Sequence, residues 1–117
     1  MKVGVIHREG TPVVPHAWLA NSPWSRLRGL LARPRLRDEA EQALWLRPCG
    51  SVHTVGMSYP LDIIFLDRAG RVLDWREGLR PWRARRCKGA TQTIELAPGG
   101  IAALAPVRGE IWTWQST

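Results

Sequence analysis

Short apolar runs separated by turn residues dominate this chain and predict β-strands. The strongest run, residues 61–67, is apolar on both faces, as expected for a buried strand. A tight turn at residues 68–70 and a second apolar run after it predict a β-hairpin. Together these patterns predict strands over residues 2–7, 13–19, 43–47, 51–55, 61–67, 71–75, 91–96 and 110–114. We expect strand 13–19 to lie at a sheet edge, because Pro15 interrupts it.

One amphipathic helix is predicted over residues 23–33. Ser22 is a good N-cap, and Pro23 suits the first helical position. Apolar residues then recur at helical spacing, which predicts one buried stripe along the helix. Pro34 ends the pattern, because the residue before a proline is disfavoured in the helical conformation.

The remaining pattern completes a single mainly β domain. Residues 101–105 predict a short helix, and the proline and basic residues of 78–88 predict a loop. A chain of 117 residues fits one domain, which we place over residues 1–117. Short strands with one packed helix favour a small barrel or sandwich.

The sequence predicts no membrane segment and no export signal. No stretch approaches the roughly 20 apolar residues that a membrane helix requires. The first ten residues include Lys2, His7, Arg8 and Glu9, and they lack the apolar core of a signal peptide. We therefore expect a soluble, cytoplasmic protein.

The chain is strongly basic, and residues 80–88 are rich in cations. The net charge is +7, and every basic residue except Lys2 and Lys88 is an arginine. Residues 80–88 hold five cations and no acidic residue. An anionic partner such as nucleic acid would explain this excess. Because no nucleic-acid motif accompanies it, a coding preference for arginine is the alternative, and nucleic-acid binding through 80–88 remains a secondary hypothesis.

The sequence contains two cysteines, Cys49 and Cys87, and does not decide whether they are free thiols or form a disulfide. Free thiols are the usual state in the cytoplasm, whereas a disulfide between the two would close a long loop. A metal site would have to combine them with His53 and Asp62. The chain has no CxxC pair, and one histidine with two thiols falls short of a typical zinc site. We predict neither a metal nor a cofactor.

The run from Cys49 onward carries a family signature. Its residues match a His, a nearby Met, Pro-Leu-Asp, Phe-Leu-Asp, a glycine turn and a valine, here His53, Met57, Pro60, Leu61, Asp62, Phe65, Leu66, Asp67, Gly70 and Val72. Further matches lie at Arg28, Gly29, Leu30, Leu31, Ile94, Glu95, Leu96, Pro98, Gly99, Gly109 and Glu110. The sequence thereby resembles the bacterial and archaeal family called domain of unknown function 192. Leu31 and Glu110 depart from the family's Met and Asp.

The resemblance implies a small, jelly-roll-like β fold with a helix packed on it. It implies no established reaction, substrate or cofactor, so function has to be argued from side chains. His53 is the only histidine within the signature, and it could act as a general base oriented by Asp62. The alternative is structural: Asp62 is hydrogen-bonded to His53 or to Arg28, because a buried carboxylate needs partners.

The leading hypothesis is a non-enzymatic binding or accessory module. Trp82 lies among arginines in the predicted loop, and Trp and Arg are the residue types enriched at binding hot spots. The candidate ligand-binding residues are His53, Met57, Asp62, Trp82 and Arg83. A small acid–base enzyme that uses His53 and Asp62 is the first alternative. The ligand or protein partner and the oligomeric state are not determined by the sequence.

Overall fold

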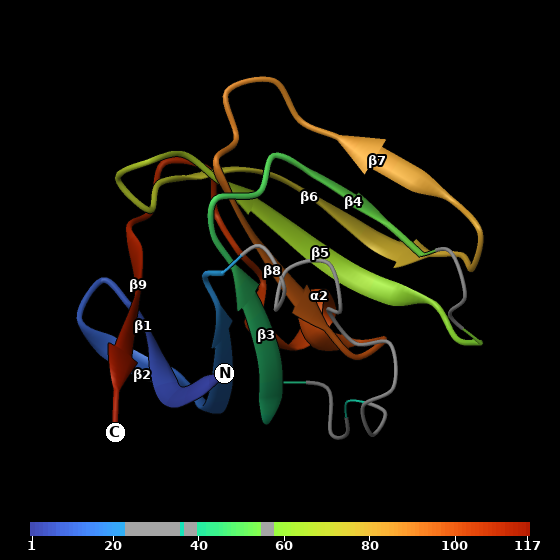
Figure 1. Ribbon diagram of the computed structural model, residues 1–117. Helices are drawn as coiled ribbons and strands as arrows, with labels where there is room; N and C mark the ends of the chain where they lie inside the picture. The colour runs from blue at the N-terminus through green and yellow to red at the C-terminus, as the bar shows by residue number, and fades with distance from the viewer. Residues whose placement is uncertain (23–35, 37–39, 55–57) are drawn as a thin grey trace.

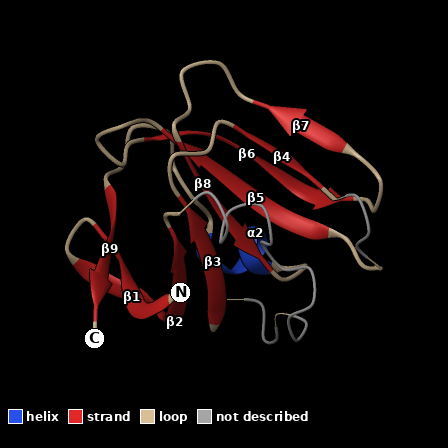
Figure 2. Ribbon diagram, viewed as in Figure 1, coloured by secondary structure: helices blue, strands red, loops and turns tan. Residues whose placement is uncertain are grey.

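The computed structural model describes residues 1–22, 36, 40–54 and 58–117, and these residues form a mainly β fold (Figures 1 and 2). The described elements are β1 (Lys2–Arg8), β2 (Thr11–Ala20), β3 (Gln42–Leu46), β4 (Ser51–His53), β5 (Leu61–Leu66), β6 (Val72–Leu79), β7 (Ala84–Arg86), β8 (Gln92–Leu96), α2 (Gly100–Leu104) and β9 (Trp112–Ser116). The predicted mainly β class is confirmed. The predicted helix over residues 23–33 lies outside the described residues, whereas the short helix predicted at 101–105 corresponds to α2.

Seven strands form one sheet in the order β6-β5-β8-β3-β2-β1-β9, and β4 pairs with β7 in a separate ribbon. All neighbours in the large sheet are antiparallel except β2 and β3, which run parallel. Its two edge strands, β6 and β9, do not pair with each other as strands in the described part of the chain; the segments beside them are joined by an isolated bridge between Arg71 and Ile111 and by backbone hydrogen bonds such as Trp112 N–H to the Gly70 carbonyl at 2.8 Å. The described strands therefore form a curved open sheet, which does not close into a barrel.

Strand β5 contributes apolar side chains to both faces of the sheet. All of its residues are buried. Ile64 and Leu66 contribute to one core cluster, which also contains side chains of α2. Ile63 and Phe65 contribute to a second cluster on the opposite face. Because side chains alternate along a strand, a strand covered on both faces reads as a continuous apolar run, as the sequence predicted.

Strand β2 is not an edge strand, and this corrects the prediction made from Pro15. It pairs with β1 on one side and with β3 on the other. The β1–β2 register shifts between the Gly4–Ala17 and Ile6–Val14 pairs, and Pro15 falls within this irregularity. A bulge leaves residues outside the regular ladder, so a proline there removes no regular hydrogen bond.

Residues 78–88 are also more ordered than predicted. Strand β6 extends to Leu79, and residues 84–86 form β7 instead of remaining in a loop. Strand β7 is only three residues long and exposed throughout, so it carries no apolar alternation that a sequence pattern could detect. Its existence depends on pairing with the distant strand β4.

No described helix is long and apolar enough to span a membrane.

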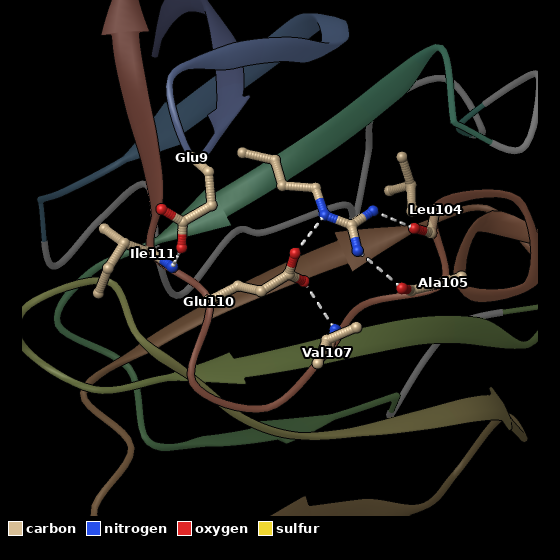
Figure 3. Close-up of polar contacts among 7 residues, drawn as sticks. Glu9, Leu104, Ala105, Val107, Glu110 and Ile111 are labelled. Atoms are coloured by element: carbon tan, nitrogen blue, oxygen red, sulfur yellow. Dashed lines mark hydrogen bonds and ion pairs between the residues drawn. The ribbon is translucent and has the colours of Figure 1, made fainter.

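Arg8 joins the end of β1 to the segment between α2 and β9, and Figure 3 labels its partners Glu110, Leu104 and Ala105. Its Nε donates to Glu110 Oε2 at 2.7 Å, and its Nη atoms donate to the carbonyl oxygens of Leu104 and Ala105. Glu110 Oε1 in turn accepts from the Val107 N–H at 2.7 Å. These bonds satisfy carbonyl groups at the C-terminal end of α2, which the helix itself leaves without partners. The cluster is therefore a structural clamp.

Replacing Arg8 by methionine should lower the free energy of unfolding by about 2 kcal/mol. Methionine retains apolar stem volume over the Trp112 ring but removes the donors to Glu110 and to the carbonyl groups. Urea unfolding followed by tryptophan fluorescence would measure the loss. Arg108→Met is the matched control, because the exposed pair of Arg108 with Asp74 should contribute less than about 1 kcal/mol. Equal losses in the two variants would contradict the clamp.

Candidate binding surface on the β4–β7 ribbon

The β4–β7 ribbon has one buried face and one exposed face. Its register pairs Ser51 with Arg86, Val52 with Arg85 and His53 with Ala84. Val52 is buried in the second core cluster and anchors the ribbon to the body of the protein. Because side chains alternate, Ser51, His53, Ala84 and Arg86 share the opposite, exposed face. In Figure 1 the ribbon lies on the opposite side of the molecule from β1 and β2.

Thr54 ties the turn before β7 to the end of β4. Its hydroxyl donates to the Arg80 carbonyl and accepts from the Arg83 N–H at 2.9 Å. Its backbone N–H donates to the Arg83 carbonyl at 2.8 Å, and its carbonyl accepts from the Trp82 N–H at 3.0 Å. Thr54 itself is only 1% exposed. The turn that carries Trp82 is therefore held by a buried residue.

Trp82 is displayed in a strained and exposed conformation. Its φ is 62°, in the left-handed region that bulky residues rarely adopt. Its exposed fraction is 65%, whereas Trp45 and Trp112 are almost completely buried. Exposing a large aromatic side chain and straining its backbone both cost free energy, and such features concentrate at functional positions. Trp82 therefore differs in its surroundings from these two buried tryptophans.

Five cations surround Trp82 and extend along β7 into the following turn. They are all exposed, and they are Arg80, Arg83, Arg85, Arg86 and Lys88. The ion pairs found among the described residues join Arg8 to Glu110, Arg71 to Asp67 and Arg108 to Asp74. None of these described ion pairs involves the five cations, so the ribbon presents a local positive field.

Two hollows follow the ribbon. The first, of about 690 Å³, is lined by residues 50–51 and 86–90, including Arg86 and Lys88. The second, of about 360 Å³, is lined by Arg47, Pro48, Arg68, Thr91 and Gln92. The Cys49 N–H donates to the Thr91 carbonyl at 2.7 Å and links the two chain segments between the hollows. Sequence analysis did not identify these hollows, because distant residues form them.

Asp62 lies in the interior, away from the exposed ribbon face. It is 2% exposed, and its oxygens accept backbone N–H groups of Gly78 at 2.8 Å, Gly99 at 3.1 Å and Ile101 at 3.0 Å. It thus ties the end of β6 to the start of α2. His53 is exposed on the ribbon and is not among these partners. The described contacts therefore do not join His53 and Asp62 into an acid–base pair.

Three of the predicted ligand-binding residues lie on or beside the β4–β7 ribbon. His53 pairs with Ala84 in β7, and Trp82 and Arg83 are bonded to Thr54, the next residue after His53. These three candidate residues therefore belong to one surface. Met57 lies outside the described residues.

Cys49 and Cys87 are not joined to each other by a disulfide. Both are partly buried against the second core cluster. Burial raises the pKa of the Cys87 thiol, and the nearby Asp74 carboxylate acts in the same direction. A raised pKa keeps the thiol protonated, and the protonated form is a poor nucleophile and metal ligand. Within the described residues, no group of three or more His, Cys, Asp or Glu side chains could hold a metal ion.

The fold and this surface define a small mainly β protein with an exposed cationic ribbon. The chain belongs to the family described as Uncharacterized ACR, domain of unknown function 192 (DUF192), whose model matches residues 5–111. The family resemblance predicted from the sequence is thereby confirmed. No curated protein matches this chain.

Two solved structures share the fold. A protein of unknown function from Novosphingobium aromaticivorans DSM 12444 is 24% identical, with a TM-score of 0.77 over 97% of this chain and 84% of that chain. A protein from Sinorhizobium meliloti 1021, described as a candidate transcription regulator, is 19% identical, with a TM-score of 0.76 over 97% of this chain and 92% of that chain. At these identities the likeness concerns the fold.

Proposed function

We propose that this protein is a non-enzymatic binding module whose β4–β7 ribbon binds an anionic partner. The observation that carries the proposal is Trp82, which is 65% exposed in a left-handed backbone conformation at the head of five exposed cations. Trp and Arg together provide apolar contact area and charge-assisted hydrogen bonds, the combination found at binding hot spots.

The ribbon supports this proposal better than it supports catalysis. General acid–base chemistry requires a positioned pair of groups within reach of a substrate. The carboxylate expected to orient His53 is instead buried and bonded to three backbone N–H groups. A binding surface needs only that its side chains remain accessible, and the residues of β7 do so.

Heparin, a flexible polyanion, provides the test. We expect the protein to be retained on heparin at low salt and released as salt rises, because cation–anion contacts displace condensed counterions. Arg86→Glu, on the exposed face of the ribbon, should weaken this binding about tenfold, which corresponds to about 1.4 kcal/mol. Elution salt and titration of soluble heparin would both measure the effect.

Lys2→Glu is the matched control. Lys2 is also exposed, and its replacement changes the net charge by the same amount, but it lies on β1, on the opposite side of the molecule from the ribbon (Figure 1). If overall charge alone governed binding, the two variants would elute together. That result, or an absence of retention at low salt, would overturn the proposal.

A further inference from the structure

We infer that the anionic partner is a single-stranded nucleic acid, which binds along a cationic track from Trp82 through the first hollow to the second. This inference rests on the proposed function and specifies its ligand. The track comprises the exposed side chains of residues 82–88 together with the linings of the two hollows.

The parts of the track are continuous along the protein surface. Arg86 belongs both to β7 and to the lining of the first hollow, opposite Ser51 on the exposed face. The same two chain segments then continue into the second hollow, which adds Arg47 and Arg68. Residues 82–88 alone span at most about 20 Å in an extended conformation. Such a length suits an extended chain with a repeating charge.

Trp82 adds an aromatic ring to the track, and binding of a simple polyanion would not need such a ring. An exposed indole ring offers a flat apolar surface on which an unpaired base can stack, whatever its identity. Arg83 lies next to it, and its Nη1 donates to the Trp82 carbonyl at 3.3 Å, which keeps the guanidinium near the turn. The stacking surface and the cation for a neighbouring phosphate are thus adjacent.

The hollows supply a second, independent indication. Their volumes lie at about the size of small-ligand pockets, so each has room for a planar group displaced from a strand. The second hollow adds the charges of Arg47 and Arg68 beside that space.

A double helix and an acidic protein fit this surface less well. In a duplex the bases are paired and stacked on each other, so Trp82 would have no free base face to contact. An acidic protein would satisfy the arginines, but it would leave the two hollows without a matching group. Only a single strand offers phosphates and free planar groups in alternation.

The test uses a fluorescein-labelled ten-nucleotide oligo(dT) and measures anisotropy. Trp82→Ala should weaken its binding about tenfold, within the range observed when base–aromatic stacking is removed. Trp82→Phe retains a stacking ring and should stay close to the wild-type affinity. Neither variant changes the charge, so a difference in affinity between Trp82→Ala and Trp82→Phe reports on the aromatic ring alone. Their circular dichroism would confirm that the fold is intact.

Oligonucleotide length tests the track. Arg68→Gln, in the second hollow, should weaken binding of the ten-nucleotide strand several-fold but leave a three-nucleotide strand unaffected, because the shorter strand would bind at Trp82 and not extend so far. Arg71→Gln is the control, because Arg71 is exposed near Asp67 and lines neither hollow.

The outcomes separate this inference from the proposed function. Tighter binding of the single strand than of the same sequence as a duplex, lost in Trp82→Ala, supports the inference. Heparin binding without oligonucleotide binding, or equal or tighter binding of the duplex, overturns the inference and leaves the proposed function standing. No binding to either polyanion overturns both.

Discussion

Replacing Asp62 by alanine is expected to lower the free energy of unfolding by about 3–5 kcal/mol. Asp62 is 2% exposed, and its two oxygens accept three backbone N–H groups from the end of β6 and the start of α2. Alanine would leave these donors without their acceptor in a site that water hardly reaches, and buried unsatisfied donors are costly. Urea unfolding monitored by tryptophan fluorescence would measure the loss.

Asp67→Ala is the matched control. The Asp67 carboxylate also accepts two backbone N–H groups, from Ala69 and Arg71, both at 2.9 Å. It lies in an accessible turn, however, so water can replace the lost acceptor and the loss should be about 1 kcal/mol. If the two variants were destabilised equally, the role assigned here to Asp62 would be wrong. Asp62→Asn should fall between them, because its amide keeps a single acceptor oxygen.

This role for Asp62 also changes how its family motif is understood. The sequence predicted a carboxylate at the start of an apolar strand that would need partners, and that physical requirement is met. It offered His53 and Arg28 as those partners, because a sequence shows side chains and not the backbone that folds around them. The observed donors come from residues 16 to 39 positions away, which no local pattern could identify.

The elements that the sequence predicted best are those with strong apolar patterns. Strand β5 was predicted from its continuous apolar run, and its burial on both faces confirms this basis. Strand β7 was missed because three exposed residues, two of them arginines, carry no such pattern. Strand β2 was assigned to an edge because a bulge around Pro15 depends on the register with β1. In both β7 and β2 the structure depends on pairing with strands that the local sequence pattern does not reveal.

The candidate surface was only partly predictable for the same reason. Trp82 and Arg83 were selected from composition, and His53 from the motif. Their common location depends on the β4–β7 pairing and on the hydrogen bonds of the buried Thr54, which no sequence pattern shows. The five cations of residues 80–88 were the sequence signal for an anionic partner, and the sequence alone could not show that they lie on a paired ribbon beside Trp82.

The buried carboxyl of Glu95 is expected to make the free energy of unfolding depend strongly on pH. This residue lies in the central strand β8 opposite Leu44 of β3 and Ile63 of β5, and it is 6% exposed. Burial raises the pKa of Glu95 from 4.5 to about 7. The folded protein therefore binds this proton more tightly than the unfolded chain does. Its stability should fall as pH rises from about 4.5 to about 7 and then level off.

Glu95→Gln should remove this dependence, because the amide resembles the neutral acid in shape and carries no charge at any pH. We expect the variant to be more stable than the wild-type protein by about 1 kcal/mol at pH 5 and by about 3 kcal/mol at pH 8. Urea unfolding of both proteins at several pH values between 5 and 8 would measure the difference. A difference that stays constant over this range would show that Glu95 is already ionised at pH 5.

Glu110→Gln is the control, because the pKa of the Glu110 carboxylate is shifted in the opposite direction from that of Glu95. The hydrogen bond from Arg8 lowers the pKa of Glu110 in the folded protein. The ionised Glu110 carboxylate therefore stabilises the fold at pH values above its unfolded pKa, and this stabilisation is lost as the pH falls through its lower pKa in the folded protein. That window lies below pH 5. Glu110→Gln should therefore be less stable than the wild-type protein by a constant amount between pH 5 and 8. Only the buried carboxyl of Glu95 should give a difference that grows with pH.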